Sequence, residues 1–212
     1  MKKLFTYAIL PLCAIALAYF IFMSITKPVK FNTEQAAREK VAIERLKDIR
    51  TLQVTYKSAF NRYAPTMDTL IDFYKNGKIT IVKQIGSMDD SVAVAKKLVR
   101  RESIEVFVRD TLFNNRPNFD VEALRYIPFS DEDTIIMSTI VKQVSGVDVP
   151  LFEAKIPYGV RPAPGQPFRG LLKGMDEQLI INLNAERNDT NRYPGLMVGS
   201  IDNANNNAGN WE

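Results

Sequence analysis

Residues 4–26 read LFTYAILPLCAIALAYFIFMSIT, a run of 23 residues without a charged side chain. As an α-helix rising 1.5 Å per residue, such a run is about 34 Å long and spans a hydrocarbon core of about 30 Å. The sequence therefore predicts a transmembrane anchor over residues 1–27. A cleaved signal peptide is the alternative, because Lys2 and Lys3 precede the run. Against it, the run exceeds the ~7 to 15 apolar residues usual in signal peptides, and no A-x-A-like cleavage site follows.

Basic residues flank the apolar run on both sides: Lys2 and Lys3 before it, and Lys27, Lys30, Arg38 and Lys40 after it. Taken alone, the positive-inside rule favours a cytoplasmic C-terminal domain. However, the last two basic residues alternate with Glu34 and Glu39, and a short basic start before an apolar run is typical of an uncleaved signal anchor. We expect a single-pass inner-membrane protein whose domain lies outside the cytoplasm and whose first partner is membrane lipid.

A long amphipathic helix is predicted over residues 28–64. Pro28 should end the spanning helix, because proline lacks an amide donor, and Asn32 or Thr33 can cap the helix that follows. Side chains then recur at spacings of three and four, namely Ala42, Leu46, Ile49, Gln53, Tyr56, Phe60 and Tyr63. We expect this face to pack on the chain's own domain or to bind a protein partner or a second copy. The expected interaction residues are Leu46, Ile49, Gln53, Tyr56 and Phe60.

An α+β domain is predicted over residues 65–201. Pro65 stops the long helix, Thr66 starts a short helix with the sequence DTLIDFYK, and this helix ends at Asn76-Gly77. Six β-branched or alternating segments then predict strands in a mostly antiparallel sheet, namely residues 78–83, 103–108, 134–144, 149–158, 179–183 and 196–201. A hairpin turn is expected at residues 145–148 and a helix at residues 91–101. The Asn-rich tail, residues 202–212, is expected to be mobile unless Trp211 docks.

The chemistry-bearing residues are few. The chain has no histidine and its one cysteine, Cys13, lies in the apolar run, which excludes His-based metal sites, Ser-His-Asp triads and disulfides. The acidic run at residues 130–133 lacks the ligand spacing of a calcium loop and is interpreted as a solvated turn. Asp89 and Asp90 are interpreted as charges at a helix N-terminus. We expect no catalytic, cofactor or metal-binding residues.

A basic cluster, Lys96, Lys97, Arg100 and Arg101, closes the helix expected at residues 91–101. The formal net charge of the chain is only +4, and no aromatic interleaving accompanies the cluster. We therefore expect no nucleic-acid binding, and a contact with lipid headgroups is no better supported than a solvated face.

The segment AREKVAIERLKDIRTLQVTYKSAFNRY, residues 37–63, together with the apolar helix before it, resembles the N-terminal half of type IV pilins and pseudopilins. The stretch NRYAP at residues 61–65 is similar to the N-x-x-Y-P loop of that family. The resemblance implies an amphipathic helix packed on a small antiparallel sheet. The phrases KPVKFN, IGSMDDS and YPGLMVGS also resemble uncharacterised single-pass envelope proteins of Bacteroidota.

From this architecture and these resemblances we expect a membrane-anchored, non-catalytic structural or assembly component of a bacterial envelope complex. A membrane-tethered module that binds a ligand or lipid is the main alternative. An enzyme without a recognisable motif is the less favoured one.

Overall fold

The computed structural model describes residues 10–85, 100–144 and 146–212, and it confirms the α+β class with a long N-terminal helix. The chain divides into two compact units, and each is described separately below. The first unit holds residues 1–43, 128–131 and 157–196, and the second holds residues 44–127, 132–156 and 197–212.

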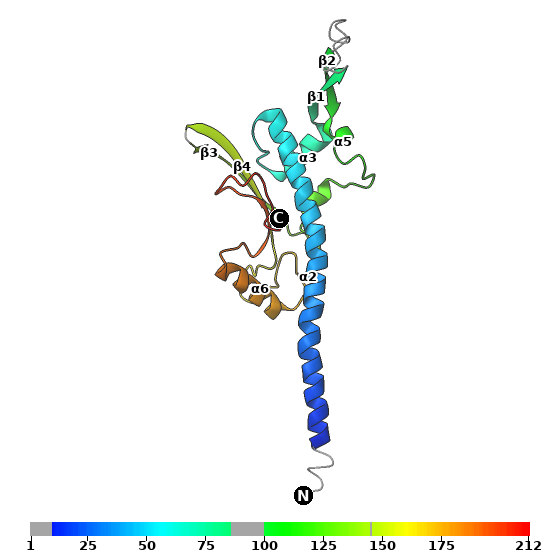
Figure 1. Ribbon diagram of the computed structural model, residues 1–212, viewed down its shortest axis with the longest axis vertical. Helices are drawn as coiled ribbons and strands as arrows, with labels where there is room; N and C mark the ends of the chain where they lie inside the picture. The colour runs from blue at the N-terminus through cyan, green and yellow to red at the C-terminus, as the bar shows by residue number, and fades with distance from the viewer. Residues whose placement is uncertain (1–9, 86–99, 145) are drawn as a thin grey trace, which may run out of the picture. The chain divides into compact units, whose positions relative to one another are not determined.

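Helix α2, Leu10–Phe60, is one continuous helix of 51 residues with Pro28 inside it (Figure 1). The expectation that Pro28 ends the spanning helix is therefore wrong, and α2 crosses the predicted boundary between residues 27 and 28. A proline inside a helix costs about 3 kcal/mol, and the long runs of helical residues on both sides outweigh that single loss. Thr33 caps nothing, because its hydroxyl donates to the carbonyl of Val29 one turn earlier (2.9 Å).

In the first unit, α2 packs beside helix α6, Glu177–Asp189. The strand predicted over residues 179–183 is wrong, since these residues lie in α6. Asp176 starts the helix by accepting hydrogen bonds from the amides of Gln178 and Leu179 (3.0 and 3.3 Å). The core of this unit consists of buried apolar side chains: Phe31, Ala42, Tyr158, Phe168, Leu171, Leu172, Ile180 and Leu196.

The helices of the second unit follow the end of α2. Asn61, at φ 56°, takes the left-handed conformation that ends α2, and its amide donates to the carbonyl of Lys57 (2.8 Å). Helix α3, Met67–Asn76, begins at the cap Thr66, as expected. Gly77 ends it in an extended conformation, and a Cβ there would approach the carbonyl oxygen of Phe73 to 2.3 Å. Short helices α5, Val108–Thr111, and η2, Glu122–Arg125, complete the helical part.

Two antiparallel hairpins make the strands of the second unit. β1, Lys78–Ile85, pairs with β2, Arg100–Phe107, and β3, Ile136–Val144, pairs with β4, Val147–Pro157. Val144 pairs with Val147, so the two strands meet within the turn predicted at residues 145–148, although Val147 and Asp148 already belong to β4; Gly146 has a φ of 82°. β5, Gly195–Gly199, lies on the other side of β4, in the order β3-β4-β5. β3 is therefore an edge strand.

The Asn-rich tail is folded back rather than loose. The amide of Gly199 donates to the carbonyl of Ala208 (3.0 Å) and the amide of Asn210 donates to the carbonyl of Met197 (3.0 Å), so residues 208–210 run along β5. Arg50 of α2 pairs with the carboxylate of Glu212 (2.7 Å). Asn206 and Asn207 adopt the left-handed backbone conformation, which asparagine tolerates better than most residues do. This conformation allows the tail to turn back toward β5.

Candidate functional site

The α2 stripe, defined as Leu46, Ile49, Gln53, Tyr56 and Phe60, forms the helix side of the second unit's core. Its first four side chains are buried, whereas Phe60 is 50% exposed. Leu52, which the periodicity did not select, is also fully buried and widens the buried face. While this unit is folded, most of the stripe is occupied by the chain itself, which favours the expectation that the helix packs on its own domain.

Gln53 is the one polar residue of the α2 stripe, and its hydrogen bonds account for its burial. Its side-chain amide donates to the carbonyl oxygen of Ala64 (3.1 Å), and its carbonyl oxygen accepts a hydrogen bond from the amide of Ala64 (2.9 Å). Both residues are fully buried. Gln53 therefore behaves like a strand partner for the loop at residues 61–65, and it holds that loop against α2.

Aromatic side chains close both sides of this loop. Tyr56 and Phe73 meet edge to face at 5.0 Å between ring centroids, and the ring of Tyr63 lies 4.8 Å from that of Phe152 on β4. These pairs contribute core packing. A second group joins Tyr74, Phe113 and Phe119 under the guanidinium of Arg116.

An open hollow of about 470 Å³ lies beside the loop. Tyr56, Arg62, Tyr63, Pro65 and Thr69 line it on the helix side, and Thr139, Ile140, Val141, Pro150 and Leu151 line it on the β3–β4 side. Arg62 supplies the one charged group in the lining. The hollow offers an aromatic wall and a cation, but neither a carboxylate nor a lysine is among these lining residues.

Most of the large exposed apolar side chains described in the second unit lie on its strands. On β3 they are Ile136, Ile140, Val141 and Val144, and on the β1–β2 hairpin they are Ile81, Val82, Ile104 and Phe107. Because an edge strand has backbone groups without a ladder partner, β3 combines unpaired hydrogen-bonding groups with apolar side chains. This combination is typical of surfaces that pair with another chain.

In the first unit, a half-buried polar network surrounds the buried Tyr158. Arg187 donates to the hydroxyl oxygen of Tyr158 (3.0 Å), and Gln35 donates to the carboxylate of Glu39 (2.8 Å). Burial, and next the hydrogen bond that the tyrosine donates to Glu39, raise the pKa of Tyr158 well above its ordinary value. A tyrosine with a raised pKa stays neutral, so this network joins α2 to α6 and does not prepare a proton acceptor.

Arg38 adds a second link within the same unit. Its guanidinium donates to the carbonyl oxygens of Leu171 (3.2 Å) and Lys173 (2.9 Å) and pairs with Glu34 (2.8 Å). The ring of Phe129 lies 5.2 Å from the guanidinium carbon. Arg38 is thus part of the folded unit rather than a loose juxtamembrane charge.

One carboxylate of the acidic run at residues 130–133 forms an ion pair within the first unit. Asp131 forms an ion pair with Lys173 (2.5 Å), and its side chain is exposed. Within residues 10–85, 100–144 and 146–212, the structure contains no group of three or more acidic or thiol side chains placed to hold a metal.

Several expectations fall outside the described residues. Asp89, Asp90, Lys96 and Lys97 belong to residues 86–99, as does most of the helix expected at residues 91–101. The last two residues of that expected helix, Arg100 and Arg101, have the backbone of strand β2 instead.

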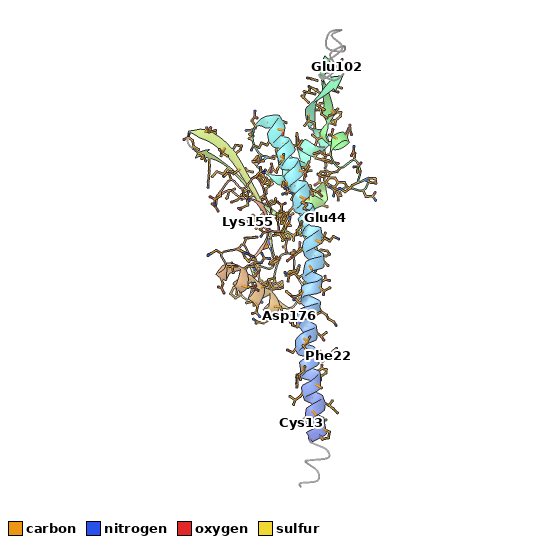
Figure 2. All side chains as sticks on the ribbon, in the orientation of Figure 1. Cys13, Phe22, Glu44, Glu102, Lys155 and Asp176 are labelled. Atoms are coloured by element: carbon orange, nitrogen blue, oxygen red, sulfur yellow. The ribbon has the colours of Figure 1, made fainter. Side chains whose placement is uncertain are left out.

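The first part of α2 differs from all other elements. Its large apolar side chains are exposed, with Leu12 at 68% and Phe22 at 65%. By length and composition it is the one helix in the described part of the chain that can cross a membrane, as an anchor or as a signal sequence near the N-terminus. Figure 2 shows Cys13 and Phe22 on this uncovered part of the helix.

No known protein family, curated protein or solved structure matches the chain.

Proposed function

We propose that the chain is a single-pass, membrane-anchored, non-catalytic component of a bacterial envelope complex, with a pilin-like arrangement of its long helix. The observation that carries this proposal is the contrast along α2. Large apolar side chains between Leu12 and Val29 are exposed, whereas Leu46, Ile49, Leu52 and Tyr56 are buried in the second unit. Burial of each exposed side chain is worth about 1.5 to 3 kcal/mol, so a lipid environment for this segment is strongly favoured.

Retention of the anchor is tested on membranes from cells that express the full chain. After alkaline carbonate extraction the protein should stay in the pellet, and the N-terminal mass should include residues 4–26. A mature form that begins after Thr26 would identify the segment as a cleaved signal sequence, and it would overturn the proposal.

The proposed topology places residues beyond Lys27 outside the cytoplasm. Arg38 supports it, because its charge is compensated by Glu34 and used inside the folded unit. Lys27, Lys30 and Lys40 then remain to oppose Lys2 and Lys3 in the positive-inside comparison. A reporter that is active only in the cytoplasm, fused after residue 212, should be silent, and an active reporter would reverse the topology.

Assembly is proposed to use the exposed edge of β3, because the α2 stripe is occupied by the core. Replacing Ile140 with lysine places a charge on an exposed apolar site, with little expected effect on the fold. The variant should lose partner proteins, or copies of itself, that the parent retains after detergent solubilisation. Gln143→Lys is the matched control, since it adds the same charge at an exposed position of the same strand. Unchanged complexes for Ile140→Lys would exclude this edge.

The alternative of a tethered binding module has one supporting observation, the hollow beside Tyr56, Arg62 and Tyr63. Under this alternative Arg62→Ala should abolish binding of an acidic ligand and leave co-purifying proteins unchanged. The two β3 variants above would then behave alike.

A further inference from the structure

A second hollow, of about 280 Å³, lies in the first unit where α2 leaves the apolar segment. Lys27, Lys30 and Phe31 line it from α2, and Met175, Asp176 and Leu179 line it from the start of α6. Figure 2 places Asp176 next to α2 at this level. We call it the juxtamembrane hollow.

The position of this hollow along the helix sets its depth relative to a bilayer. Residues 4–26 span about 34 Å as a helix, which matches a hydrocarbon core of about 30 Å. Lys27 is the next residue, and Phe31 lies about 6 Å further along the axis. If the anchor spans the membrane, as proposed above, the juxtamembrane hollow lies in the layer of lipid headgroups.

The charges around the hollow favour an anion. Lys27 and Lys30 are exposed, lie one turn apart, and have no ion-pair partner in the part of the chain that the structure describes. The carboxylate of Asp176 is engaged by two amides at the start of α6, where the helix dipole favours it. Its neighbour Glu177 pairs with Arg161 (2.5 Å). Two ammonium groups therefore remain for a ligand.

The rest of the lining is apolar. Phe31 is only 8% exposed, and the side chains of Met175 and Leu179 are half-buried. Apolar walls beside two cations suit a phosphate that carries an organic headgroup, because the methylene groups of that headgroup can pack on the walls. A free phosphate would use only the lysines.

We propose that the juxtamembrane hollow binds the headgroup of an anionic phospholipid, with the phosphate between Lys27 and Lys30 and the alcohol group beyond the phosphate against Phe31, Met175 and Leu179. The bound lipid would then hold the first unit at the membrane surface. This inference rests on the proposed anchorage and adds a specific ligand to it.

The test uses the full chain in nanodiscs of phosphatidylcholine, with or without phosphatidylglycerol, and native mass spectrometry after release. The parent should retain a phosphatidylglycerol molecule, and Lys27→Gln/Lys30→Gln should retain it ~30-fold less, because each lysine contributes about fivefold near an anionic surface. Lys40→Gln/Lys47→Gln is the control, since it removes the same charge from exposed positions further along α2. It should retain the lipid like the parent.

Three outcomes would overturn the inference. They are equal retention by both double variants, no retention by the parent, and displacement of the lipid by inorganic phosphate, which would identify a small-anion site instead. Insertion is measured separately with a spin label at Phe22→Cys in a Cys13→Ser background. If oxygen reaches the label, the helix is inserted in the bilayer. Insertion without lipid retention refutes only the proposed lipid binding by the hollow. A label exposed to water refutes the anchorage itself.

Discussion

Replacing Gln53 with leucine tests the contact that joins α2 to the loop at residues 61–65. Leucine fills a similar volume but removes the partners of the amide and the carbonyl of Ala64, which are fully buried. Each unpaired buried group costs about 1 to 3 kcal/mol, and the greater apolarity of leucine returns part of that loss. We expect the free energy of unfolding to fall by about 2 to 4 kcal/mol.

The measurement is a denaturant titration of the full chain in detergent micelles, followed by the emission of Trp211, the single tryptophan. Gln143→Leu is the control, because it makes the same substitution at an exposed position of β3 and should change the unfolding free energy by less than about 0.5 kcal/mol. If Gln53→Leu is as stable as the parent, the loop is held by other contacts and the account of Gln53 is refuted.

A second variant, Gln53→Glu, separates hydrogen bonding from shape. Its protonated carboxyl can donate to the carbonyl of Ala64 and accept from the amide, whereas the ionised form places an unpaired charge in a dry site. Burial should raise the pKa of this carboxyl above its unfolded value of about 4.3. The loss of stability should therefore be small at acidic pH and grow as the pH rises from about 4.3 through the folded-state pKa. A loss independent of pH would contradict this explanation.

Two further predictions use the same titration. Ile49→Ala should lower the free energy of unfolding by about 2 to 5 kcal/mol, because it leaves a cavity in a packed site. Lys47→Ala, on the exposed face of α2, should change it by less than about 0.5 kcal/mol. Equal effects of the two variants would mean that the periodicity of α2 does not describe a packed face. The ion pair with Arg50 lowers the pKa of Glu212, so the tail contact should persist at neutral pH and be lost as the pH falls through that lowered value. The emission of Trp211 should report this loss, and Arg50→Met should remove the acid transition if the ion pair holds the tail.

The parts of the fold that the sequence predicted are those governed by local chemistry. The spacing of Leu46, Ile49 and Tyr56 identifies the buried face of α2, because helical periodicity places these side chains together. The cap Thr66 and the turn at Gly146 also follow from local preferences of the backbone. These features need no knowledge of distant residues.

Two predictions of secondary structure were wrong, and in each a local sequence signal was outweighed by a longer helix. Residues 179–183 are apolar and partly alternating, which suggested a strand, but the cap Asp176 and the helix-forming residues after Leu183 extend a helix through them. Pro28 suggested a helix end, yet one missing hydrogen bond is a small loss in a helix of 51 residues. In both cases the length of the element outweighs the local signal.

The candidate surfaces could not have been found from residue types. Ile140 and Ile156 are the same side chain on adjacent strands, but Ile140 is 42% exposed and Ile156 is fully buried. The difference follows from β3 lying at the edge of the sheet while β4 lies between two neighbours. Strand order depends on pairings between distant parts of the chain, which periodicity does not encode. The α2 stripe was selected as an interaction surface for the same reason: amphipathic periodicity identifies an apolar face but does not say whether the chain itself or another molecule covers it.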